Sequence, residues 1–185
     1  MIIKLQTPRL ILRQWQESDY PAFIEMGQDP EVMRYFPALL TPEQSLQFIE
    51  KVTRQIEQHG WGLWAVELKE NKEFIGFIGL QPQPELFEFS PCIEIGWRLA
   101  KKFWHHGYAT EGAKAVLKHA FRNLRLDMVV SFTACLNTPS ERVMQRLGME
   151  KVREFDHPLL PPEHALSKHV LYEIQRSDYL HIPFC

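Results

Sequence analysis

The hydrophobic pattern of the chain is clearest between residues 92 and 124, where two periodicities follow one another. From 92 to 99 apolar and polar residues alternate, and this period of two predicts a strand. One face of that strand is apolar and the other is mainly polar: Ile93, Ile95, Trp97 and Leu99 against Glu94, Gly96 and Arg98. From 109 to 124 apolar residues recur at helical spacing, which predicts an amphipathic helix. A short basic turn ending in Gly107 joins the strand to the helix.

The rest of the chain shows further strands and helices in mixed order. Apolar, β-branched runs predict strands at 9–13, 61–68, 74–80, 128–134, 149–155 and 169–174. Helix starts are predicted at Ser18-Asp19, at Thr41-Pro42 with Gln44 completing a capping box, and at Asn137. The segment 29–40 is expected to form a short helix plus a loop, and the proline-rich segment 81–91 a loop. This order predicts an α+β (mixed α/β) fold, a mixed sheet flanked by helices.

Composition narrows the class of protein. With 185 residues the chain fits one domain, residues 1–185, and its net charge of -2 gives no broad electrostatic case for nucleic acid or an anionic membrane. The three cysteines are widely spaced without a C-x-x-C pair, which is typical of free thiols in a reducing compartment. The histidines form no metal-binding pattern, so no metal site is expected. Without a signal-like or membrane-spanning stretch, a cytoplasmic protein is expected.

The turn that joins the strand to the helix in the 92–124 region is a candidate anion site. A helix start leaves unpaired backbone N–H groups at the positive end of the helix dipole, and such groups bind phosphate. Basic side chains strengthen that field: Lys101, Lys102, His105 and His106. The alternative is an ordinary strand-to-helix connection with solvated lysines.

Four stretches of the chain together resemble the GNAT family of acetyl-CoA-dependent N-acetyltransferases, and within it the RimJ/RimL-type branch. They are Arg9 to Trp15 with Asp19, Ile93 to Trp97 continuing through Trp104 to Glu111, Asn137 to Ser140 continuing through Arg146 to Met149, and His169 to Tyr172. The order and spacing of all four fit, so the resemblance covers essentially the whole chain. It implies a twisted, mostly antiparallel sheet whose central strands splay apart to admit the thioester and pantetheine of acetyl-CoA.

The resemblance also implies which residues hold acetyl-CoA. The family's pyrophosphate pattern Q/R-x-x-G-x-G/A reads here from Trp104 to Ala109, with Trp104 in place of the leading polar residue and His105 in place of a small one. The implied pyrophosphate contacts are His105, His106, Gly107, Tyr108, Ala109 and Thr110. The implied pantetheine contacts are backbone groups around Trp97, Arg98 and Leu99, with Asn137 from the opposite strand's end.

Two residues are candidates for proton transfer. Glu94 is the sole carboxylate in the otherwise apolar run 93–97, so it is the candidate general base, acting through water. The alternative is a carboxylate that faces solvent or pairs with Arg98. As in the branch, Ser140 could protonate the leaving thiolate, whereas serine at a helix start commonly serves as a cap. Thr138 and Glu141 fit a capping box by themselves, which would leave Ser140 free for chemistry.

The expected function is acetyl transfer from acetyl-CoA to a primary amine by direct attack in a ternary complex. The branch implies a protein N-terminal α-amine, such as that of a ribosomal protein, and a small amine is the other expected acceptor. The protein is expected to be a monomer or a homodimer. Two alternatives remain at this level. One is a non-catalytic acyl-CoA-binding sensor or scaffold, and the other is an ATP- or GTP-binding module, for which the usual lysine and hydroxyl pattern is missing.

Overall fold

The computed structural model describes residues 3–181, which form eight strands and five α-helices. The strands make one sheet in the order β1-β2-β3-β4-β5-β6-β8-β7. Pairing is antiparallel in β1-β2, β2-β3, β3-β4, β6-β8 and β7-β8, whereas β5 and β6 run parallel. This mixed, mostly antiparallel sheet with helices confirms the predicted fold class. The chain packs as two compact units, one holding the chain up to Leu80 with 96–116, the other holding 81–95 and the chain from 117 onward.

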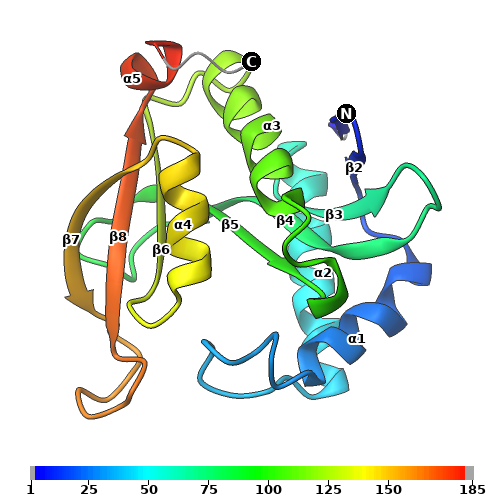
Figure 1. The fold of residues 1–185 in the computed structure, drawn as a ribbon, viewed down its shortest axis with the longest axis horizontal. Coiled ribbons are helices and arrows are strands. Elements are labelled where there is room, and N and C mark those ends of the chain that lie inside the picture. Colours follow the sequence, from blue (N-terminus) through cyan, green and yellow to red (C-terminus); the bar gives the residue numbers. More distant parts are fainter. Residues whose placement is uncertain (1–2, 182–185) are drawn as a thin grey trace. The chain divides into compact units, whose positions relative to one another are not determined.

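The first unit contains the N-terminal strands and two helices. Its elements are β1 (Leu5–Gln6), β2 (Leu10–Arg13), α1 (Tyr20–Gln28), α2 (Pro42–His59), β3 (Leu63–Leu68) and most of β4 (Phe74–Gln83). It also holds the C-terminal half of β5 (Cys92–Leu99) and the start of α3 (Tyr108–Arg122). Helices α1 and α2 pack against each other (Figure 1).

Helix α2 shows how closely local sequence signals fix an element. The Thr41 side chain accepts from the Gln44 N–H, and the Gln44 side chain accepts from the Thr41 N–H, so the predicted capping box is confirmed. Gly60 ends the helix in the left-handed region at φ 78°. The buried stripe Ile49, Val52 and Ile56 faces the core.

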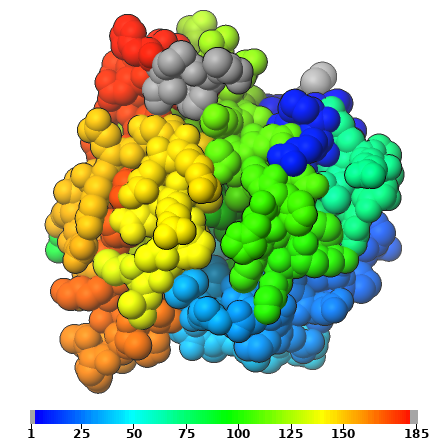
Figure 2. Space-filling model, viewed as in Figure 1, coloured from blue at the N-terminus to red at the C-terminus, as the bar shows by residue number. Residues whose placement is uncertain are grey.

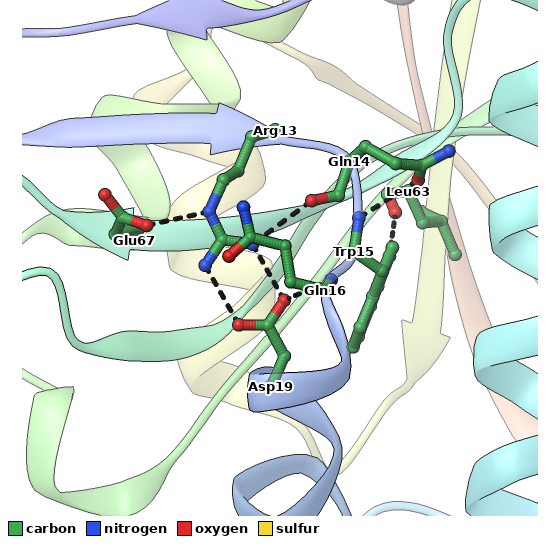
Figure 3. A network of polar contacts seen from close by, with 7 residues as sticks. All are labelled: Arg13, Gln14, Trp15, Gln16, Asp19, Leu63 and Glu67. Atoms are coloured by element: carbon green, nitrogen blue, oxygen red, sulfur yellow. Dashed lines mark hydrogen bonds and ion pairs between the residues drawn. The ribbon is translucent and has the colours of Figure 1, made fainter.

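A buried ion-pair network joins β2 to the start of α1 (Figure 3). The Arg13 guanidinium donates to both carboxylate oxygens of Asp19, at 2.7 and 2.9 Å, and its Nε donates to Glu67 on β3 at 2.7 Å. These acceptors, the Asp19 hydrogen bonds foremost, raise the pKa of Arg13 against the opposing effect of burial. The adjacent Trp15 donates its indole N–H to the Leu63 carbonyl at 2.8 Å. In the first of the four stretches that resemble the family, Arg13, Trp15 and Asp19 therefore serve to hold this unit together.

The second unit is built around the C-terminal strands. Its elements are β6 (Met128–Ala134), α4 (Thr138–Arg146), β7 (Glu150–Asp156), β8 (Lys168–Gln175) and α5 (Arg176–His181). Strands β6 and β8 pair at seven positions, from Met128 with Gln175 to Ala134 with His169. Helix α4 packs on β6, and its outward surface is open to solvent, drawn in yellow in Figure 2.

Some predicted elements are wrong or misplaced. Residues 30–38 form turns and bends without a helix, so the short helix expected in 29–40 is wrong. Strand β4 continues to Gln83, into the segment expected to be a loop. The short elements β1 and α5 were not anticipated, because two or six residues carry too little periodicity to identify.

Candidate active site

The end of β5 is held rigidly against β4. Gly76 lies so close to it that a Cβ there would meet the Arg98 carbonyl oxygen at 2.1 Å and the Leu99 Cα at 2.8 Å. Gly76 also has φ 138°, which side-chain-bearing residues rarely adopt. The Ala100 N–H donates to the Ile75 carbonyl at 3.0 Å. The backbone at the end of β5 therefore has little freedom.

The backbone groups of Trp97 and Leu99 face away from β4. Since alternate residues of a strand direct their N–H and C=O groups to opposite sides, and Ala100 bonds to β4, Leu99 and Trp97 point the other way. This is the orientation that the predicted pantetheine contact requires. The Leu99 carbonyl already accepts from the Trp104 indole N–H at 2.8 Å. Trp104, the departure from the family pattern, thus ties the turn to the end of the strand.

The turn from His105 to Thr110 presents a run of free backbone donors. None of its six N–H groups donates to an atom of residues 3–181, and the first helical bond of α3 runs from Glu111 to the Gly107 carbonyl at 3.0 Å. His105 and Gly107 both adopt the left-handed region, at φ 63° and 79°. Consecutive amides in such a conformation form an anion-binding concavity at a helix N-terminus. The local geometry fits a pyrophosphate.

The one carboxylate in the first turn of α3 is neutralised. Glu111 accepts from the Thr7 hydroxyl at 2.5 Å, from the Arg9 N–H at 2.9 Å and from the Arg9 guanidinium at 2.6 Å. These bonds, which outweigh burial, lower the pKa of Glu111. Arg9 also lies over the Tyr108 ring, 4.5 Å from its centroid. A negative charge that would repel phosphate is therefore compensated by a fixed guanidinium beside the turn.

Glu94 lies in β5 in the second unit, where its carboxylate accepts from the Gln83 amide at 2.6 Å. Burial raises the pKa of Glu94 from 4.5 to about 7, and the hydrogen bond from Gln83 partly opposes that rise. Glu94 is the register partner of Val130 in β6, and the Ser131 hydroxyl donates to the Ile95 carbonyl at 2.9 Å. A carboxyl group with a pKa near neutrality is suited to accept a proton at physiological pH.

The segment after β6 carries the other two predicted residues of this unit. The Asn137 side chain accepts from the Ser140 N–H at 3.3 Å and donates to the Thr133 hydroxyl at 2.9 Å. Asn137 is therefore the N-cap of α4, and the expected cap by Thr138 with Glu141 is wrong by one residue. The Ser140 hydroxyl makes no hydrogen bond within the described chain, so it does not cap the helix, and its catalytic role stays a prediction.

The Tyr172 hydroxyl is held by two hydrogen bonds. It donates to the Glu141 carboxylate at 2.9 Å and accepts from the Gln145 amide at 3.2 Å. Burial, helped by the neighbouring Glu141, raises the pKa of Tyr172. These bonds give Tyr172 a structural role, linking β8 to α4.

Each unit thus carries one set of the predicted residues. In the first, the Trp104 indole joins the end of β5 to the turn 105–110. In the second, Glu94 is paired with β6, and Asn137 and Ser140 follow the end of β6. Sequence reasoning missed Gln83, the partner of Glu94, because Pro82 argued against a strand there. No helix of the described chain has the length and apolar character needed to cross a membrane.

Comparison with known proteins identifies the family of the chain. The family model for the acetyltransferase (GNAT) domain matches residues 9–150. The protein YkkB of Bacillus subtilis (strain 168) is 31% identical over 160 residues, 84% of this chain and 92% of YkkB. The FsC-acetyl coenzyme A-N(2)-transacetylase of Aspergillus fumigatus is 30% identical over 187 residues, 95% of this chain and 77% of that protein. A crystal structure of a GNAT-family acetyltransferase from Bacillus anthracis superposes with a TM-score of 0.79 at 27% identity, covering 95% and 99% of the two chains. The chain therefore belongs to the GNAT family of N-acetyltransferases, enzymes whose acetyl donor is acetyl-CoA.

Proposed function

We propose that this enzyme acetylates a primary amine by direct attack on acetyl-CoA, with Glu94 as general base. The observation that carries the proposal is the Glu94 carboxyl, half-buried in β5 with a pKa raised to about 7 and hydrogen-bonded by Gln83. A group of this kind is partly deprotonated near neutral pH and can take a proton from an ammonium through one bridging water.

The chemistry fits the strength of that base. An ammonium has no lone pair, so the acceptor must lose a proton before its nitrogen attacks the acetyl carbonyl carbon. The α-amino group of a peptide has a pKa of roughly 7.7–8.0, whereas a lysine amine lies at roughly 10.4. Deprotonating an α-amine is therefore a modest task for Glu94, and positioning supplies much of the remaining rate.

The remaining roles in the proposal belong to the turn and to α4. The amides of 105–110 bind the pyrophosphate, and the backbone groups of Trp97 and Leu99 bind pantetheine together with Asn137. The backbone of Arg98, expected to share this contact, instead faces Gly76 of β4. As the new C–N bond forms and the C–S bond breaks, the Ser140 hydroxyl protonates the departing thiolate. The support for this role is that the Ser140 hydroxyl is free while Asn137 caps the helix.

The acceptor in this proposal is a protein N-terminal α-amine, as in the RimJ/RimL branch, or a small amine. The similarity to a transacetylase that acts on an N(2) position supports nitrogen as the accepting atom. A peptide α-amine also matches the modest basicity that Glu94 has to overcome.

A thiol-release assay tests the proposal. Purified protein, acetyl-CoA and a panel of short peptides with free N-termini and small amines should release CoA, with Glu94→Gln and Ser140→Ala each lowering kcat more than they raise the KM for acetyl-CoA. Glu150→Gln, an exposed glutamate on β7, is the matched control. Direct attack further predicts that protein incubated with acetyl-CoA alone gains no acetyl mass. An acetylated protein, or an unchanged kcat in both variants, would contradict the assignment.

A further inference from the structure

Arg98 has a buried guanidinium whose hydrogen-bonding capacity is unused. Its Nε and Nη1 atoms are inaccessible to solvent and have no hydrogen-bond partner among the described residues. Burial lowers the pKa of Arg98 to about 10, so the group remains charged at neutral pH. A buried cation normally has a carboxylate or a set of carbonyl acceptors around it, as Arg13 has in the same unit.

Aromatic rings surround the Arg98 guanidinium instead. Its central carbon lies 4.1 Å from the centroid of the Phe36 ring, 5.4 Å from that of Phe77 and 6.0 Å from that of Phe48. The faces of such rings attract a cation, but the rings accept no strong hydrogen bond from the N–H groups that lie in the plane of the guanidinium. The plane of the guanidinium, with its forked donors, is the part left without a partner.

The rings around Arg98 differ in their exposure to solvent. Phe77 lies in the core of its unit at 6% exposed, whereas Phe36 is 38% exposed. Phe36 belongs to the segment 30–38, which has no regular secondary structure. Atoms of this part of the chain lie at the surface, in azure in Figure 2. Gly76 and β4 fix the backbone of Arg98. A ligand would therefore have to reach the guanidinium from the side of Phe36, the exposed ring.

We propose that Arg98 binds a carboxylate of the acceptor amine and makes the enzyme selective for acceptors that carry one. A carboxylate is planar and accepts two parallel hydrogen bonds from one fork of the guanidinium, Nη2–H with either Nε–H or Nη1–H, which supplies one of the two missing partners. The proposal rests on the proposed function, because Arg98 lies between Trp97 and Leu99, the residues assigned to pantetheine. The phosphates of acetyl-CoA are the other source of an anion, and they are assigned to the separate turn 105–110.

The test compares acceptors that differ only in carrying a carboxylate or an uncharged carboxamide. A series of ω-amino acids of increasing chain length is assayed beside the corresponding carboxamides, in which a distant amine keeps the same pKa. The wild type should acetylate at least one acid about tenfold more efficiently in kcat/KM than its amide, a difference of about 1.4 kcal/mol. Arg98→Met should bring that ratio to about one, without changing the KM for acetyl-CoA. Arg54→Met, an exposed arginine paired with Glu50 on α2, should leave the ratio unchanged.

Each outcome decides the proposal. Equal rates for acids and amides at every length would overturn it, and so would an Arg98→Met variant whose only defect is a higher KM for acetyl-CoA. If no amine supports CoA release, the proposed function fails, and Arg98 is tested by thermal unfolding of the CoA-saturated protein. There the acids, and not the amides, should raise Tm. Should Arg98→Met not fold, Arg98→Lys provides the comparison, because its ammonium lacks the fork and should reduce the ratio.

Discussion

Glu94 shows how one side chain can cost stability and supply chemistry. Its carboxyl is the only one in β5, and the desolvation that raises its pKa to about 7 disfavours the ionised form that a base requires. Gln83 donates a hydrogen bond that partly restores the ionised form. The balance of these two effects sets the pH at which the base becomes active.

We expect kcat/KM of the wild type to rise with pH through about 7, because Glu94 must lose its proton before it can act. Glu94→Gln should lower kcat by about a hundredfold and remove this limb of the profile. The measurement is CoA release between pH 5.5 and 9 at saturating acetyl-CoA. A wild-type limb that survives in Glu94→Gln would show that another group is titrating.

Replacing Gln83 should move the same limb. In Gln83→Met the carboxylate loses a donor that stabilises its charge, so the pKa of Glu94 should rise and the activity limb should shift to higher pH. The limiting rate at high pH should remain close to that of the wild type, since the base itself is present. A shift toward lower pH would contradict this account of the site.

The stability of Glu94→Gln should depend on pH in a defined direction. The pKa of this carboxyl is higher in the folded than in the unfolded protein, so wild-type stability falls as pH rises from about 4 through about 7. The variant lacks this loss and should gain about 3 kcal/mol over the wild type at pH 8 and nothing at pH 4. Urea unfolding at the two pH values measures the difference, with Glu150→Gln as control.

At the scale of elements, the strand–turn–helix around Gly107 relies on backbone conformation rather than on side chains. Gly107 has φ 79°, and a Cβ added there would find ordinary space, 3.6 Å from the Arg9 guanidinium. A side chain at Gly107 would therefore destabilise the protein through backbone strain and not through a steric clash. This makes the turn a clean place to separate stability from ligand binding.

Gly107→Ala should destabilise the protein by about 1 kcal/mol and weaken acetyl-CoA binding about fivefold or more, because the strained turn realigns its amides. Gly148→Ala supplies the matched control, since Gly148 has φ 77° at the far end of α4 and should show the stability loss alone. Calorimetric titration with acetyl-CoA distinguishes them. Equal affinities in both variants would argue against a pyrophosphate site at 105–110.

The Arg13–Asp19 pair should behave as a purely structural link. Asp19→Asn leaves a buried guanidinium with weaker acceptors, so we expect a loss of about 3 kcal/mol in the free energy of unfolding. Glu17→Gln, an exposed change two residues earlier, should have little effect. The folded Asp19→Asn variant should keep the wild-type Kd for acetyl-CoA, and a large change in that Kd would contradict the structural role.

The sequence predicted the long elements well and their ends less well. Helix α2 was readable because its cap, buried stripe and terminal glycine all agree. The N-cap of α4 could not be predicted in the same way, because Asn137, Thr138 and Ser140 are all good capping residues and only the packed structure selects Asn137. Similarly, Glu94 stands out as a carboxylate in an apolar run, whereas Gln83 was hidden behind Pro82 in a segment expected to be a loop.

At the scale of the whole molecule, neither strand pairing nor unused hydrogen-bonding capacity can be read from local pattern. The order β5-β6-β8-β7 depends on contacts distant in sequence and was not predicted, since the resemblance to a known family implied only a mostly antiparallel sheet with splayed central strands. The amides of 105–110 and the Nε and Nη1 atoms of Arg98, which have no acceptor among residues 3–181, are likewise visible only after their possible partners in that part of the chain have been placed. Both are donors without acceptors, which is what a site for anionic ligands requires.

The measurement that tests the central claim most directly is thermal unfolding with acetyl-CoA, free CoA, ATP and NAD in parallel. A ligand at a hundred times its Kd stabilises the folded state by about 2.7 kcal/mol, which is a visible rise in Tm. The account predicts this rise with acetyl-CoA and CoA, its reduction in Gly107→Ala, and no rise with ATP or NAD. Absence of a shift with either CoA form, or an equal shift with all four ligands, would contradict the assignment of the turn and of the chemistry built upon it.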